Sequence, residues 1–188
     1  MKEDLDFNYV NSCFVIKDNL LYWRDSRPLS HFTSTKAWNI WKTKNAGKEA
    51  GGFSRSREDA TAYRYVCMNG GVKYAAHRVI WLLSYGEWPK GVLDHIDGNG
   101  LNNSLENLQD TDQVYNSRNS QMNSLNKSGV CGVHWDASRS KWVAMGYITL
   151  DGKKKGIYLG RFINLEDAKV AREKWQMEQG GFTDRHGK

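Results

Sequence analysis

The alternation of apolar and polar positions is clearest in the middle of the chain. Residues 63–66 alternate as a strand does, and the Asn-Gly-Gly sequence at 69–71 is typical of a tight turn. Residues 72–74 predict the returning strand. The mostly apolar run at 76–85 predicts a largely buried helix, which ends where Gly86 follows it.

Two more short strands are predicted further along. An apolar strand at 92–93 leads into a Gly- and Asn-rich loop at 97–104, and another strand is predicted near 105–108. Thr111 then has a side chain that suits a helix N-cap. This order of elements predicts a β-β-α unit.

Residues 1–60 give weaker signals. A short strand is predicted at 20–23, after the turn at 17–19. Residues 34–53 mix tryptophans and lysines with glycines and have no helical period. They are therefore predicted as an irregular basic loop region.

The C-terminal part of the chain has strand signals of its own. The polar residues 117–129 are predicted as a linker. Three strand-like runs follow at 130–135, 141–149 and 154–160, and Asp151-Gly152 predicts a hairpin turn between the last two.

A final helix is predicted after an Asn164 cap, and its apolar face repeats with helical spacing at Ala168, Ala171 and Trp175. The whole pattern predicts an α+β fold in four parts. These are an N-terminal basic extension that is a candidate DNA contact (1–60), a β-β-α domain (61–118), a linker (119–128), and a small three-stranded antiparallel sheet with one helix (129–188).

The composition excludes several classes of protein. The 188 residues are 39% hydrophobic and 12% aromatic, which is typical of a folded chain. No run of eighteen apolar residues and no apolar signal segment are present, so neither a membrane span nor secretion is expected. The three cysteines lie far apart, which disfavours a zinc ribbon or disulfide framework and fits a reducing cytoplasm.

The net charge of +6 is unevenly distributed. Residues 17–57 carry nine Lys and Arg against three acids, and residues 127–162 carry seven against two, whereas residues 58–126 are slightly acidic. Two basic arms suit a polyanionic partner. From charge alone, solvated faces of a basic protein explain the pattern equally well.

The residues that suggest chemistry are concentrated in the predicted β-β-α unit. Hydrolysis of a phosphodiester needs a base for water and a cation for the charge on phosphate. Adjacent Asp94 and His95 at the end of a strand supply both kinds of group, although a regular strand points them to opposite faces. The Gly-rich loop allows the strand to end there, and the following helix brings up Asn116.

These residues resemble the HNH nucleases, especially the homing endonucleases of phages and introns. Their pattern is Asp-His, then Asn after twelve residues, then Asn or His nine residues later. This chain has Asp94-His95, Asn107 and Asn116 at those spacings, with His77-Arg78 ahead of an apolar helix as in the family. The resemblance covers residues 77–116.

The resemblance implies a role for each matching residue. His95 would be the general base, Asp94 and Asn116 would hold one metal ion, and Asn107 would bond backbone across the loop and help orient His95. Three further residues are candidates for DNA contact: His77, Arg78 and Arg118. For His77, a satisfied core histidine stays an equal alternative.

The ligand types favour a particular metal. Many HNH nucleases have His where this chain has Asn116, so the site offers a carboxylate and an amide oxygen. Such hard ligands favour Mg²⁺ or Mn²⁺ over zinc, with one ion per active site. The resemblance then implies one-metal hydrolysis that leaves 5′-phosphate and 3′-hydroxyl ends.

Each of these residues also has a purely structural interpretation. Asp94-His95 can be a hydrogen-bonded pair, the sequence at 97–100 can be only a turn, and the asparagines can cap local backbone. The complete set at matching spacing favours the nuclease.

A second resemblance covers most of residues 128–175. Gly132-Val133, Lys141-Trp142, Leu159-Gly160 and Glu166-x-Ala168 are similar to the Apetala/ethylene-response-factor DNA-binding domain. In that family a three-stranded sheet lies in the major groove, and a helix backs it. The candidates for DNA contact carried over are His134, Arg139, Lys141, Trp142, Lys153, Lys155 and Tyr158. For Trp142, packing in the core is an open alternative.

Together these features predict a metal-dependent endonuclease of double-stranded DNA, of the phage homing type or a free-standing nicking enzyme in the host cytoplasm. One site on a monomer or weak dimer would nick one strand. The alternatives are a non-catalytic DNA-binding regulator that retains the HNH scaffold, and a nuclease of structured RNA.

Overall fold

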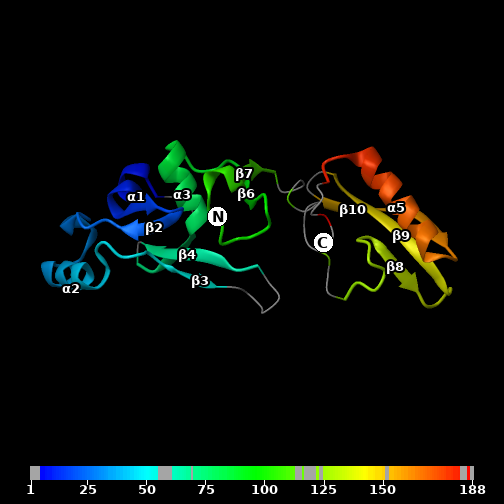
Figure 1. The fold of residues 1–188 in the computed structure, drawn as a ribbon, viewed down its shortest axis with the longest axis horizontal. Coiled ribbons are helices and arrows are strands. Elements are labelled where there is room, and N and C mark those ends of the chain that lie inside the picture. The colour runs from blue at the N-terminus through cyan, green and yellow to red at the C-terminus, as the bar shows by residue number, and fades with distance from the viewer. Residues whose placement is uncertain are drawn as a thin grey trace. The chain divides into compact units, whose positions relative to one another are not determined.

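The computed structural model divides into two compact units, Met1–Thr111 and Asp112–Lys188, which are described separately (Figure 1). The residues described are 5–54, 61–68, 70–112, 116, 122, 125–150, 153–182 and 186. Several predicted features lie outside them in whole or part, namely Asn69 of the first turn, the helix expected after Thr111, the candidate DNA contact Arg118, much of the linker at 119–128, and the Asp151-Gly152 turn.

The first unit begins with a helix and a hairpin. Helix α1 (Phe7–Cys13) follows Asp6, whose carboxylate accepts a hydrogen bond from the Tyr9 backbone N–H at 3.2 Å. Strand β1 (Phe14–Lys17) pairs with β2 (Leu20–Trp23) across a two-residue turn. Both turn residues have positive φ, which such a turn requires. The predicted strand at 20–23 is confirmed, and its partner β1 was not predicted.

The prediction of an irregular loop over residues 34–53 is wrong. After a short 3₁₀ turn (Leu29–His31), helix α2 (Thr35–Asn45) begins at Ser34, whose hydroxyl accepts a bond from the Ala37 N–H. None of its residues is buried, so it has no apolar stripe that a periodicity argument detects. Tertiary contacts hold it instead: Trp41 packs edge-on against Trp23 at 5.5 Å between ring centroids.

A three-stranded sheet follows, with the order β3-β4-β5. Strand β4 (Tyr63–Met68) pairs with both β3 (Gly52–Ser54) and β5 (Val72–Ala75) in antiparallel register. Helix α3 (Ala76–Tyr85) then ends at Gly86 with φ of 80°, a conformation that glycine adopts without strain. The predictions of two strands and a buried helix over residues 63–85 are confirmed.

One core joins the beginning and the middle of this unit. Helices α1 and α3 lie close to β2 and β4 (Figure 1), and their buried side chains pack together. That core contains Val10, Cys13, Phe14, Leu21, Trp23, Ala50, Val66, Met68, Tyr74, Ala76, Val79, Ile80 and Leu82. Residues 5–54, predicted as a separate extension, are therefore part of the same folded body as the segment that follows.

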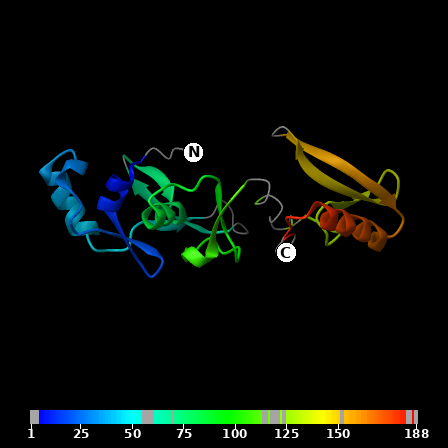
Figure 2. The same ribbon diagram turned by 90° about the horizontal axis from the view of Figure 1, so that it is seen from above.

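The last hairpin of this unit consists of β6 (Val92–His95) and β7 (Leu108–Thr111), which pair in antiparallel register. The segment predicted as a strand from residue 105 begins instead with a 3₁₀ turn (Leu105–Asn107). Thr111 is the last residue of β7. The hairpin and α2 lie at opposite ends of the unit (Figures 1 and 2).

The helix predicted after this hairpin is described at one position. Asn116 is helical, and its backbone N–H donates to the Asp112 carbonyl at 3.1 Å, four residues back. Asn116 belongs to the second unit, whereas Asp94 and His95 belong to the first.

The second unit contains the predicted three strands and one helix. Its sheet has the order β10-β9-β8, formed by β8 (Val133–Asp136), β9 (Lys141–Leu150) and β10 (Lys153–Phe162). Helix α5 (Leu165–Gln179) lies across this sheet (Figure 1). Asn164 occupies the cap position as predicted, although its side chain makes no capping bond to the helix backbone.

The two faces of this sheet differ. Gly146 of β9 lies against the Trp175 ring of α5, so close that a Cβ atom there would be 2.5 Å from the ring. Side chains alternate along a strand, so Ala144 and Trp142 share that covered face. Val133, Ala144 and Ala168 form the buried centre of the unit. No helix in the described parts of the chain is long and apolar enough to cross a membrane.

Candidate active site

His95 is the last residue of β6 and is almost completely buried, with 3% of its surface exposed. Its Nε2 atom lies 3.0 Å from Oδ1 of Asn103, which is 1% exposed. Asn103 comes from the loop between β6 and β7. Sequence reasoning assigned Asn103 no catalytic role and left a local cap as one alternative, because spacing alone does not show that the loop folds back onto the strand.

Two aromatic rings surround His95. His77, from α3, packs edge-on against it with 4.9 Å between ring centroids, and Tyr63, from β4, lies 5.8 Å from His95 and 5.9 Å from His77. Burial first, and then the nearby His95 and Arg78, together lower the pKa of His77 to about 3. His77 is therefore neutral at neutral pH and is not a cation for a phosphate.

Asp94 lies on the opposite face of β6, where it is partly exposed. Its Oδ2 accepts a hydrogen bond of 3.2 Å from Nε2 of Gln109, its partner across the hairpin. The strand ends one residue later, at His95, as predicted from the Gly-rich loop that follows it. Gln109 was not predicted as a site residue.

Asp97 and Asn107 organise the loop that follows His95. The Asn107 Oδ1 accepts from the Asp97 N–H at 3.0 Å, and its Nδ2 donates to Asp97 Oδ1 at 2.9 Å and to the Asn102 carbonyl at 2.8 Å. Asn102 Nδ2 donates to the other Asp97 oxygen at 2.8 Å. Asn107 thus bonds backbone across the loop, whereas the atom bonded to His95 belongs to Asn103.

The carboxylate of Asp97 is held in its charged form. Desolvation acts to raise its pKa, but hydrogen bonds from Asn102, from the Asn99 N–H and from Asn107 outweigh it, so the pKa lies below the usual value. This carboxylate is bonded within the loop, and sequence reasoning took it for part of a turn.

The side-chain oxygens of the two predicted metal ligands fit a hard cation on chemical grounds. Asp94 offers a partly exposed carboxylate, and Asn116 carries an amide oxygen. Oxygen donors of this kind suit Mg²⁺ or Mn²⁺. Among the residues that the structure describes, no three His, Cys, Asp or Glu side chains gather as a metal site.

Arg78, a predicted DNA contact, is turned inward. It is 9% exposed, and its guanidinium donates to the carbonyls of Gly91 at 3.1 Å and Pro89 at 3.3 Å. Those bonds fix α3 to the segment that enters β6. Since His77 is also buried, at 8% exposed, the structure places neither residue on the surface, and the core alternative describes the position of His77.

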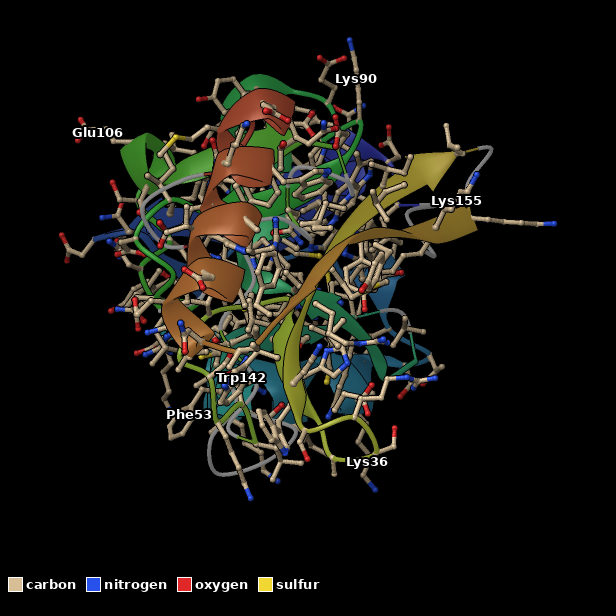
Figure 3. All side chains as sticks on the ribbon, turned by 90° about the vertical axis from the view of Figure 1, so that its right-hand side faces the viewer. Lys36, Phe53, Lys90, Glu106, Trp142 and Lys155 are labelled. Carbon is tan, nitrogen blue, oxygen red and sulfur yellow. The ribbon has the colours of Figure 1, made fainter. Side chains whose placement is uncertain are left out.

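Most of the predicted DNA contacts in the second unit are exposed, namely His134, Arg139, Lys141, Lys153, Lys155 and Tyr158. Trp142 differs, because it is half-buried and packs against the core below α5. Figure 3 shows Trp142 near one end of α5, whereas Lys155 extends from the far tip of the β9–β10 hairpin. The core alternative therefore describes the position of Trp142.

The sheet face away from α5 carries basic and aromatic side chains together. The register places His134 and Arg161 on either side of Val143, and Tyr158 beside Met145. The Arg161 guanidinium lies 6.0 Å from the Tyr158 ring centre.

Lys154 lies on this same face, with Nζ 4.3 Å from the centre of the Tyr147 ring. Arg161, Lys154 and Tyr147 were not selected from the sequence. The strand register supplies the signal, because it sorts alternate residues onto one face.

Comparisons with known proteins identify part of the first unit. Residues 74–111 match the model of the HNH endonuclease family, a range that includes α3, β6, β7 and the loop with Asn103 and Asn107. A 79-residue segment, 42% of the chain, is 39% identical to Protein 3.8 of Escherichia phage T7 and covers 64% of that protein, slightly under two thirds of its length. No solved structure matches the chain.

Proposed function

We propose that this chain is a metal-dependent endonuclease that hydrolyses phosphodiester bonds of double-stranded DNA. The observation that carries the proposal is the position of His95 within the segment similar to HNH endonucleases, at the end of a strand and hydrogen-bonded by a buried side chain. A fixed imidazole is the group expected of a general base.

The chain's own residues divide the work. His95 takes a proton from the attacking water, while the bonds between Asp97 and Asn107 keep the loop beside it in one conformation. Asp94 would hold one Mg²⁺ or Mn²⁺ ion, and Asn116 is the second ligand that the family resemblance implies. Such an ion supplies positive charge to the scissile phosphate and the leaving 3′-oxygen.

Binding of DNA is assigned chiefly to the second unit, in keeping with the Apetala/ethylene-response-factor resemblance. One face of the sheet points away from α5 and carries His134, Tyr158, Lys154 and Arg161. The first three of these side chains are exposed, and Arg161 is partly exposed. Major grooves admit a sheet or ribbon of this kind. Lysines reach phosphates as point charges, so this surface supplies affinity more than base readout.

A second candidate contact lies in the first unit. Residues 26–48 contain Arg27, Lys36, Lys42, Lys44 and Lys48 and no acid, and α2 exposes its lysines. A basic helix suits a phosphate backbone. These lysines retain the role proposed for residues 1–60 as a DNA contact.

A single active site on a monomer or weak dimer nicks one strand, whether the enzyme is of the homing type or free-standing. A phage-encoded enzyme of this kind acts in the cytoplasm of the host cell.

One observation favours the alternative of a non-catalytic DNA-binding regulator. With 3% of its surface exposed, His95 offers little area to a water molecule before DNA binds. A scaffold that retains the fold without activity would have the same burial, so activity must be measured directly.

The test is nicking of supercoiled plasmid by the wild-type chain, His95→Ala and the control His134→Ala, each with EDTA, Mg²⁺ or Mn²⁺. We expect open circles from the wild type with metal only, a loss of about 10²- to 10⁴-fold for His95→Ala, and retained turnover with weaker binding for His134→Ala. Binding without nicking under every condition would support the regulator instead. Linear product without open circles would point to paired active sites.

A further inference from the structure

Asn103 is a buried polar side chain whose amide group is hydrogen-bonded on one side only. Its Oδ1 is bonded to His95, while its Nδ2 has no hydrogen-bond partner in the described parts of the chain. A buried amide N–H group without a partner lowers the stability of the fold. An apolar side chain of similar size would avoid that cost but would leave the buried His95 Nε2 without this partner, so the amide is explained by its bond to His95.

The bond to His95 has a direct chemical consequence. An amide oxygen accepts hydrogen bonds and never donates them. At 3.0 Å from Oδ1, the His95 Nε2 must therefore carry the hydrogen. In a neutral imidazole the other nitrogen, Nδ1, then holds the lone pair and is the atom that accepts a proton.

The neighbouring rings keep His95 in this orientation. His77 and Tyr63 pack against it from α3 and β4, which limits rotation of the imidazole. His77 is neutral, so it adds no positive charge beside His95 when His95 becomes an imidazolium.

We propose that Asn103 is a positioning residue, whose side-chain oxygen holds His95 with the proton on Nε2 and so makes Nδ1 the atom that takes the proton from water. This inference rests on the proposed function. As Nδ1 receives the proton, the water oxygen bonds to phosphorus and the bond from phosphorus to the 3′-oxygen breaks. The 3′-oxygen leaves with the electron pair and takes a proton from solvent.

Asn103 and Asn107 act on different parts of the site, and the family resemblance gives a role to Asn107 alone. Asn107 bonds to Asp97 and to the Asn102 carbonyl, so it acts on the loop. Asn103 acts on the imidazole itself. Loss of the Asn103 side chain should therefore change the tautomer of the His95 imidazole. Loss of an Asn107 hydrogen bond should change the conformation of the loop instead.

The first experiment reads the tautomer without requiring activity. Full-length protein labelled with ¹⁵N histidine is observed by NMR near pH 8, where a neutral imidazole shows which nitrogen carries the proton, and His95→Ala assigns the signal. The wild type should carry the proton on Nε2. Asn103→Leu should give a mixture of tautomers, Asn103→Asp should restore the Nε2 form, and Asn102→Ala should leave it unchanged.

The second experiment uses plasmid nicking at saturating Mg²⁺. Asn103→Leu should lower kcat by about 10- to 100-fold with little change in KM, less than the loss of the base itself. Asn103→Asp should recover much of kcat, because its carboxylate oxygen also accepts from Nε2. Asn8→Leu makes the same chemical change at an exposed position of α1 and should have wild-type kcat.

The outcomes separate this proposal from the proposed function. A proton on Nδ1 of His95 in the wild type, or an unchanged kcat and tautomer in Asn103→Leu, would overturn the role of Asn103. A wild type with the Nε2 tautomer that never nicks DNA would overturn the nuclease while supporting the hydrogen bond. If Asn103→Leu does not fold, the tautomer of His95 in the wild type and the tautomer and kcat of Asn103→Asp still test the role of Asn103.

Discussion

The hairpin that carries His95 and the sheet of the second unit have opposite charge. Residues 92–112, which include β6 and β7, contain five Asp and Glu and no Lys or Arg. Residues 133–162, which include β8 to β10, contain six Lys and Arg against two acids. Both segments are antiparallel strands, so the difference lies in their side chains and not in their backbone.

This contrast indicates a division of labour in the proposed function. An acidic hairpin repels a phosphate backbone, so it needs a cation and an independent source of DNA affinity. In the proposed function the basic sheet would supply that affinity, and tethering would raise the concentration of DNA at the hairpin without new contacts there. The proposed function thereby assigns catalysis and DNA binding to different parts of the chain.

Neutralising the lysines of the second unit should test this division between catalysis and DNA binding most clearly. Replacing Lys153, Lys154 and Lys155 by Gln should weaken DNA binding up to about 100-fold and reduce the slope of log Kobs against log salt by about 2–3, because fewer counterions are released. The measurement is a gel shift in EDTA from 50 to 200 mM salt.

The matched control is the triple replacement of Lys36, Lys42 and Lys44 by Gln in α2. A smaller change in slope is expected, because α2 is proposed only as a second contact. Equal slopes for both triples would mean that the first unit grips DNA as strongly as the sheet, and the contrast would lose its functional meaning.

The two faces of the basic sheet allow a sharper comparison. Trp142→Ala should cost about 2 kcal/mol of unfolding free energy, because the ring packs into the small core below α5. His134→Ala on the exposed face should change stability by less than about 0.5 kcal/mol while weakening DNA binding. Urea unfolding followed by tryptophan fluorescence measures the first effect. If His134→Ala lost more unfolding free energy than Trp142→Ala, the assignment of His134 to the exposed face and Trp142 to the covered face would be wrong.

Acid sensitivity should distinguish the core of the first unit. The pKa of His77 is about 3 in the folded protein and about 6.5 when unfolded, so between about pH 3 and pH 6.5 the unfolded chain binds this proton and the folded chain does not. Stability from this group therefore falls as pH decreases, by at most about 1.4 kcal/mol per unit. Three groups share its surroundings: His95 from β6, Tyr63 from β4, and Arg78 from α3 itself.

His77→Leu should remove this component, so its unfolding free energy should fall less steeply than that of the wild type between pH 6 and pH 4. The control is His134→Leu on the exposed sheet, which should follow the wild-type curve. Parallel curves for the wild type and His77→Leu would mean that His77 is protonated in the folded state.

The sequence by itself determined the elements whose side-chain pattern is local. Strands over 63–66 and 72–74, the helix at 76–85 and the three strands of the second unit were predicted because alternation, helical period and turn residues are properties of neighbouring positions. The same holds for the Asp94-His95 pair at the end of a strand. Its adjacency and spacing to Asn107 can be read without a fold.

Only the tertiary structure decided what depends on contacts between distant segments. Helix α2 has no apolar stripe and is held by Trp41 against Trp23, so its own sequence lacks the signal. Arg78 and His77 look like surface groups until the packing of α3 buries them. The bond from Asn103 to His95 forms only because the loop folds back over the strand, and the strand register alone sorts Trp142 from His134. Burial and register arise from long-range packing, which local propensity does not encode.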